Sequence, residues 1–133
     1  MKNRKNEVLK TLGLFTVGGL LYNGIELLWR RRTHFSMFLV GGASFLAIGR
    51  IYCRFYKRCL MVRCAISAIA VTVIEFVSGC FLNRRLKLKV WNYQKQPFNI
   101  LGQVCLLYTV LWGFLSIPAG WLYRHLCSAE GQR

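Results

Sequence analysis

The chain has 133 residues, of which 55% are hydrophobic, and it carries nineteen Lys and Arg residues against four Asp and Glu residues. Its apolar residues form long blocks, and most of its basic residues lie between the blocks. A soluble basic domain would alternate polar and apolar residues to make wettable faces. The separation excludes an ordinary soluble domain and favours a membrane protein.

Four apolar blocks follow one another along the chain. At a rise of about 1.5 Å per residue, each is long enough to cross a hydrocarbon core of about 30 Å. A backbone in lipid must satisfy its own hydrogen bonds, so we predict that each block is a helix. The expected fold is an all-α integral membrane bundle of about four transmembrane helices, a single membrane domain over residues 1–133. The predicted spans are 9–29, 35–53, 60–82 and 100–123.

Two of the links, 30–34 and 54–59, are short and basic, so successive helices are predicted to run antiparallel. An even number of spans places both termini on the same side of the membrane. More basic residues lie in the two tails and the link 54–59 than in the other links, which predicts cytoplasmic termini. The basic links are also expected to contact anionic headgroups of the lipid bilayer.

The third link, residues 83–99, is longer and mixes basic, aromatic and amide side chains. It is either a lipid-surface loop that closes a hairpin, or a lid or docking surface over a polar site. We predict that Asn99 caps the fourth helix. An interfacial aromatic belt is expected at Trp29, Trp91 and Trp121. The candidate residues of the loops and the membrane interface are His34, Trp91, Tyr93 and Pro97.

Small and polar residues recur every three or four positions on one face of three blocks. Small residues allow helices to approach closely and polar residues hydrogen-bond across the contact, so these stripes predict the helix interfaces. They are Thr16, Gly19, Asn23 and Glu26 in the first block; Ala65, Ala68, Thr72, Glu75, Gly79 and Asn83 in the third; and Thr109, Gly113, Ser116 and Gly120 in the fourth. In the second block, Gly42 and Gly49 are expected to allow close approach.

Two of the four acidic residues lie on these stripes. An ionisable residue within a span costs about 2.5–3.5 kcal/mol to insert and is by default a candidate functional residue. In an antiparallel bundle, the ends of the first and third blocks meet the starts of the second and fourth at one leaflet. We predict a polar intramembrane cluster there, formed by Glu26, Glu75, Asn23, Asn83, Asn99 and Gln103. Three roles remain open for it: structural pairing, proton or cation handling, and substrate binding.

Other kinds of chemistry have no visible basis in the chain. The six cysteines and two histidines are too widely spaced for a metal site or a disulfide framework, so we expect neither, and no cofactor. No phosphate-binding loop or nucleophile–base pair is present, so we expect that the chain is not an enzyme. Its basic residues adjoin apolar blocks, where lipid phosphates are nearer than those of nucleic acid, so we expect no nucleic-acid partner.

Five segments carry a resemblance to a known family: GIELLWR (24–30), THFSMFLVGG (33–42), EFVSGCFLN (75–83), WNYQKQPFNILGQVCL (91–106) and VLWGFLS (110–116). They resemble the ABC-transporter type IV family of small bacterial multi-span membrane proteins. The resemblance implies a permease-like transport component of the bacterial plasma membrane, working with a separate ATPase subunit or by self-association. The chain departs from the family pattern at Asn92, where an acidic residue is common, and at Phe35, where Trp is common.

Two other functions remain open. The first is a proton-coupled exporter similar to small multidrug transporters, in which Glu26 or Glu75 exchanges protons for a cationic drug. Its mark would be substrate-driven proton release that depends on these residues. The second is a non-transport membrane scaffold or a pore former, and a pore would abolish the membrane potential on overexpression. Recovery of an ATPase with the chain would instead favour the permease.

Overall fold

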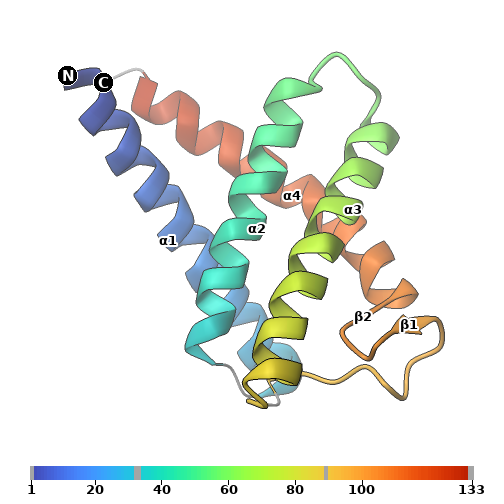
Figure 1. Ribbon diagram of the computed structural model, residues 1–133. Helices are drawn as coiled ribbons and strands as arrows, with labels where there is room; N and C mark the ends of the chain where they lie inside the picture. Colours follow the sequence, from blue (N-terminus) through green and yellow to red (C-terminus); the bar gives the residue numbers. More distant parts are fainter. Residues whose placement is uncertain (1, 32–33, 89, 132–133) are drawn as a thin grey trace.

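The computed structural model describes residues 2–31, 34–88 and 90–131. Four long helices make up most of it, and a short π-helix and a two-stranded antiparallel ribbon lie between the third and fourth (Figure 1). The elements are α1 (Lys2–Arg30), α2 (Phe35–Arg54), α3 (Leu60–Gly79), η1 (Cys80–Arg85), β1 (Asn99–Ile100), β2 (Val104–Cys105) and α4 (Leu106–Gly131).

Each long helix, the third together with η1, provides a stretch that is long and apolar enough to span a membrane. These stretches are Arg4–Trp29, Phe35–Arg54, Leu60–Arg85 and Leu106–Cys127. Large apolar side chains cover their outer faces, among them Leu28, Met61 and Phe114. A surface of this kind is unfavourable in water and suits contact with lipid. The prediction of an all-α membrane bundle with four spans is therefore confirmed.

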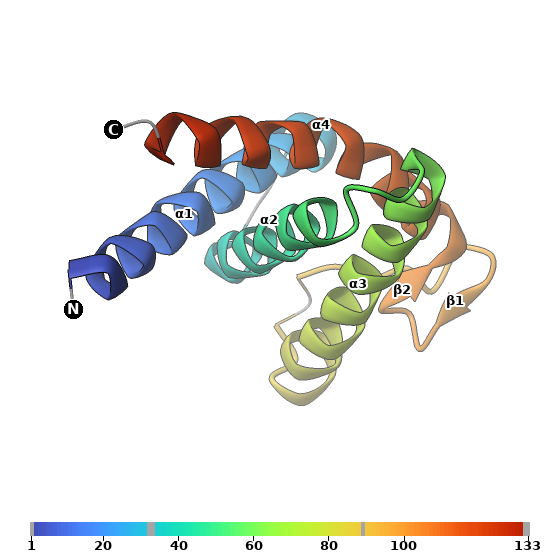
Figure 2. The same ribbon diagram turned by 90° about the horizontal axis from the view of Figure 1, so that it is seen from above.

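The helix α2 is the centre of the bundle. It packs against α1, α3 and α4, and it is the most deeply buried of the four spans. Figures 1 and 2 show α1 and α3 on either side of α2, with α4 crossing the bundle beside them. Both termini and the link between α2 and α3 lie at one end (Figure 1). The π-helix and the ribbon lie at the other end, where they can cover a site between the helices.

Glycines bring α1 and α2 into backbone contact. A Cβ atom added to Gly42 would lie 2.7 Å from the Phe15 carbonyl oxygen, and one added to Gly19 would lie 2.7 Å from the Phe38 carbonyl oxygen. The predicted close approach at Gly42 is confirmed. The prediction for Thr16 is wrong, because this side chain is exposed and donates to the Leu12 carbonyl of its own helix.

Polar side chains of the α3 and α4 stripes lie at helix contacts, as predicted. The hydroxyl groups of Thr72 and Thr109 are 2.9 Å apart and join α3 to α4, and those of Tyr52 and Ser116 are 2.8 Å apart and join α2 to α4. Gly113 and Gly120 are buried along the same face of α4. Ala65 is the exception on the third stripe, since it lies on the exposed surface of α3.

The fourth helix begins at Leu106 rather than at residue 100. Leu101 and Gly102 have φ angles of 53° and 73°, in the left-handed region that an α-helix cannot use. The Gln103 N–H donates to the Ile100 carbonyl, so the chain makes a tight turn between β1 and β2. Asn99 is therefore not the helix cap, and its side-chain oxygen instead accepts from the Gly102 N–H at 3.1 Å.

Candidate functional site

The two intramembrane carboxylates meet inside the bundle. Glu26 of α1 is 9% exposed and Glu75 of α3 is 3% exposed, and they lie close enough to repel each other. Glu75 Oε1 accepts a hydrogen bond from Trp112 Nε1 of α4 at 2.8 Å. Tyr22, one turn before Glu26 on α1, shares a side-chain hydrogen bond with Glu26 and lies within electrostatic range of both acids. The α1 and α3 stripes therefore converge on one polar centre.

Two aromatic residues connect the carboxylates, and neither was predicted as a site residue from the sequence. The rings of Tyr22 and Trp112 stack with their centroids 5.4 Å apart and their planes 15° apart. Tyr22 stands four residues before Glu26, which places both on one helical face. Trp112 immediately precedes Gly113 of the α4 stripe. These spacings could have indicated that both aromatic residues face the carboxylates. An aromatic residue in an apolar helix is, however, ordinarily interpreted as part of the core.

Glu26 lines a pocket of about 260 Å³ between α1, α4 and the loop before β1. Its wall is mostly aromatic, and Tyr93 stacks on Tyr108 with the ring centroids 4.8 Å apart. Aromatic faces and a desolvated carboxylate both attract cations. The residues that carry this chemistry are Tyr22, Glu26, Trp29, Tyr93, Tyr108 and Trp112, and we refer to this cavity as the Glu26 pocket.

An apolar cleft continues from the Glu26 pocket along the bundle. A second pocket, of about 190 Å³, lies between α1, α2 and α4. It shares four lining residues with the first, namely Tyr22, Ile25, Trp112 and Leu115. The two pockets therefore adjoin at these four residues.

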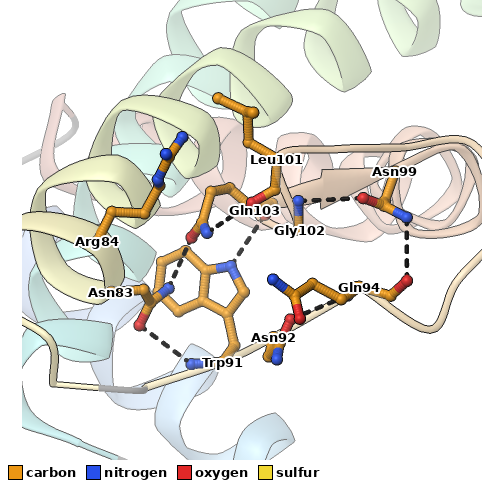
Figure 3. Close-up of a pocket in the computed structure, with 9 residues that line it drawn as sticks. All are labelled: Asn83, Arg84, Trp91, Asn92, Gln94, Asn99, Leu101, Gly102 and Gln103. Atoms are coloured by element: carbon orange, nitrogen blue, oxygen red, sulfur yellow. Dashed lines mark hydrogen bonds between the residues drawn. The ribbon is translucent and has the colours of Figure 1, made fainter.

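Asn83 and Gln103 form a second polar group, which we call the amide clasp. Asn83 Nδ2 donates to Gln103 Oε1 at 2.9 Å, and Asn83 Oδ1 accepts from the backbone N–H groups of Val90 and Trp91 (Figure 3). Gln103 Nε2 donates to the Leu101 carbonyl at 2.9 Å. These bonds hold the long loop against η1, so the amide clasp has a structural role.

The side chain of Trp91 belongs to this clasp and not to an interfacial belt. It is 5% exposed, and its indole N–H donates to the Gln103 carbonyl at 2.9 Å. The close fit depends on Gly79, where an added Cβ would lie 2.9 Å from the Trp91 ring. Trp29 and Trp121, in contrast, are 70% and 64% exposed, as an interfacial position requires.

The remaining predicted residues are spread over the same end of the molecule. His34 caps α2, with its Nδ1 accepting from the Ser36 N–H at 3.1 Å. Asn23 is half-buried on α1, and Pro97 is exposed in the loop. Asn99 lies in the ribbon, where its amide donates to the Gln96 carbonyl at 2.8 Å. The hydrogen bonds of Glu75 and of Asn83 lead to different partners, so the predicted cluster is divided into a carboxylate group and the amide clasp.

A wider pocket, of about 670 Å³, opens beside the amide clasp. Figure 3 shows the side chains of Arg84, Asn92 and Gln94 around it. Asn92 Oδ1 accepts from the Gln94 N–H at 2.9 Å, so part of this polar lining serves to fold the loop. Within the described residues, no group of three or more His, Cys, Asp or Glu side chains is placed to hold a metal ion.

Comparison with known proteins identifies the family of this chain. No solved structure matches it. Residues 14–130 match the family described as Putative ABC-transporter type IV. The matched stretch runs from α1 into α4 and includes Glu26, Glu75 and the amide clasp. It covers most of the 133 residues, and the chain therefore belongs to the Putative ABC-transporter type IV family.

Proposed function

We propose that the protein is a permease-like transport component of the bacterial plasma membrane, and that the Glu26 pocket binds its substrate, a cation with an apolar body. The observation that carries this proposal is the buried Glu26 carboxylate inside an aromatic wall. Family membership and the four spans support transport as the broad function.

Charge supports the choice of a cation. The chain has nineteen basic residues, yet none of the described residues that line the Glu26 pocket is basic. Glu75 lies within electrostatic range of Glu26. Two carboxylates in a medium of low dielectric repel each other, and a bound cation would relieve this repulsion. An anion would meet both acids and is disfavoured.

Shape supports the apolar body. The aromatic faces of Tyr93, Tyr108 and Trp112 can contact a large organic cation, which loses less hydration on entering the pocket than a metal ion does. The apolar cleft between α1, α2 and α4 offers further space for the same molecule. A substrate of this kind also concentrates in lipid, from which the bundle can take it up.

The energy source distinguishes two forms of the proposal. A permease would work with a separate ATPase chain, because this sequence contains no phosphate-binding loop. A proton-coupled exporter would exchange protons on Glu26 or Glu75 for the substrate, alone or as a self-associated assembly. The closeness of the two acids favours retaining the second form as an alternative. A passive scaffold or pore has no need for two costly buried acids.

Binding of tetraphenylphosphonium to the purified protein in detergent tests the substrate class. We expect Glu26→Gln to weaken binding at least about tenfold, which corresponds to about 1.4 kcal/mol. Glu7→Gln is the matched control, because it removes the same charge from an exposed position on the same helix. Equal affinities for these two variants, with both folded, would contradict the proposal.

Reconstitution tests the energy source. In vesicles containing the chain alone and a trapped pH indicator, a proton-coupled exporter would release protons when tetraphenylphosphonium is added, and Glu75→Gln would abolish the signal. A permease would give no such release, and an ATPase would be recovered with the chain in mild detergent. If neither proton release nor an ATPase were found while binding persisted, the transport proposal would fail.

A further inference from the structure

A basic pocket lies at the end of the bundle away from the ribbon. Both termini lie at this end (Figure 1). The volume of the pocket is about 450 Å³, and it opens between the end of α2, the start of α3 and the last turns of α4. Three basic side chains line it, Arg63, Arg124 and His125, and none of its described lining residues is acidic.

The guanidinium group of Arg63 is held in place but incompletely satisfied. Arg63 lies one turn into α3, within a stretch that is apolar enough to span the membrane. It stands over the ring of Tyr52, 5.2 Å from the ring centroid, and its Nε atom is buried without a hydrogen-bond partner among the described residues. A buried, charged donor without an acceptor is costly, so an acceptor from outside the chain would stabilise it.

The rest of the pocket is also preformed. The Tyr52 hydroxyl lies 2.8 Å from Ser116 Oγ, which fixes the ring beneath Arg63. Gly120 makes room for the same ring, because an added Cβ there would lie 2.4 Å from it. On α4, His125 stacks on Trp121 with the ring centroids 5.3 Å apart. The Arg63 guanidinium group therefore rests on an aromatic ring that is itself held in place.

We infer that this pocket is a specific site for the phosphate of an anionic phospholipid, with Arg63 as its main ligand and Arg124 beside it. Guanidinium groups bind phosphate oxygens through paired hydrogen bonds. The apolar residues Leu60, Ile117 and Trp121 at the same pocket would contact the glycerol and upper acyl region. A zwitterionic lipid would bring a quaternary ammonium group against the basic side chains and is disfavoured.

This inference is independent of the Glu26 pocket, which lies between other helix faces. It also differs from a general attraction of basic links to headgroups, because it depends on one side chain and not on total charge. Arg58, exposed in the link between α2 and α3, provides the contrast. It carries the same charge near the same membrane surface but does not line the pocket.

The test is the thermal unfolding of the full chain in detergent micelles containing phosphatidylglycerol or phosphatidylcholine, together with lipid retention measured by mass spectrometry. We expect the wild type to retain phosphatidylglycerol at least about tenfold more strongly and to be stabilised by it. Arg63→Gln should abolish the preference for phosphatidylglycerol over phosphatidylcholine, and Arg63→Lys should keep only part of it. Arg58→Gln should change it less than about twofold.

Arg124→Gln keeps the test decisive if Arg63→Gln does not fold, because Arg124 is exposed and its loss should weaken retention without disturbing the bundle. Equal retention of the two lipids, or equal losses in the Arg58 and Arg124 variants, would overturn the inference. The last measurement is thermal unfolding with inorganic phosphate in place of the lipid. If it stabilised the protein to the same extent through Arg63, the ligand would be a free phosphate and the lipid assignment would be wrong.

Discussion

At the scale of single residues, the bond between Trp112 and Glu75 is the central contact of the carboxylate group. It joins α4 to α3 at a distance of 2.8 Å, and the Trp112 ring also stacks on Tyr22 of α1. One indole thus fixes the position of a buried acid and forms a wall of the Glu26 pocket. A buried acceptor that loses its donor keeps the cost of its desolvation.

We predict that Trp112→Phe lowers the free energy of unfolding by about 1–3 kcal/mol, because Glu75 loses its hydrogen-bond donor while an aromatic ring remains. In a protein that already carries Glu75→Leu, Trp112→Phe should lower the free energy of unfolding clearly less, since no buried acid is left without its donor. Thermal unfolding of the four proteins in detergent measures the coupling. Additive losses would show that the hydrogen bond contributes nothing to stability.

At the scale of elements, the contact between α1 and α2 depends on glycine. Gly42 faces the backbone of α1 at Phe15, and this oxygen cannot move as the end of a flexible side chain can. Gly24 of α1 has a different environment, because nothing lies within 4 Å of a Cβ added there. Substitutions at Gly42 and Gly24 therefore distinguish the effect of helix packing from the general effect of glycine on helix stability.

Gly42→Ala should destabilise the bundle by about 1–3 kcal/mol, because the added methyl group overpacks the contact between α1 and α2. Gly24→Ala is the control, and it should be neutral or stabilising by up to about 1 kcal/mol through helix propensity. Unfolding midpoints in the same detergent compare the two. Similar midpoints would mean that α1 and α2 do not pack as closely as the structure shows.

The amide clasp links a different pair of elements, the end of η1 and the turn between the two strands. Asn83→Ala would remove the acceptor for the Val90 and Trp91 N–H groups and the donor to Gln103. Trypsin cleavage after Arg84, Arg85 and Lys87 should then accelerate by about 5–30-fold, as expected for a local loss of about 1–2 kcal/mol. Asn92→Ala is the control, because it removes only one hydrogen bond within the loop and should change the cleavage rate little. Equal cleavage rates in the two variants would contradict a structural role for the amide clasp.

At the scale of the whole molecule, four helices are long and apolar enough to cross the membrane, and both termini lie at one end of the bundle (Figure 1), so we expect both termini on one side of the membrane. The distribution of basic residues predicts that this side is cytoplasmic. The exposed Cys59, in the link between α2 and α3, lies at the end of the bundle with the termini, and the exposed Lys95 lies in the loop at the other end. The two positions are therefore expected on opposite surfaces.

A membrane-impermeant maleimide applied to intact cells should label a chain whose sole cysteine is introduced by Lys95→Cys. It should not label a chain that retains Cys59 alone, until the cells are permeabilised. Labelling of Cys59 but not of the Lys95→Cys chain would reverse the orientation. If both were labelled in intact cells, the arrangement of four membrane-crossing helices would be wrong.

Much of this architecture could be predicted because it rests on patterns along the chain. Block length and hydropathy predicted the four spans, and the three- and four-residue spacing predicted that Glu26, Glu75 and the stripe around Thr72 face the interior of the bundle. Lipid imposes these patterns directly, because it forces each backbone segment to satisfy its own hydrogen bonds.

The sequence by itself determined the class of protein, the number of spans and which acids lie inside them. Tertiary structure alone decided that Trp112 and Tyr22 connect these acids, that Asn99 folds a turn instead of capping a helix, and that Arg63 faces a basic pocket. The physical reason is that spacing fixes the face a residue occupies on its own helix. The partner it meets depends on the rotation and crossing of neighbouring helices, which packing between distant segments sets.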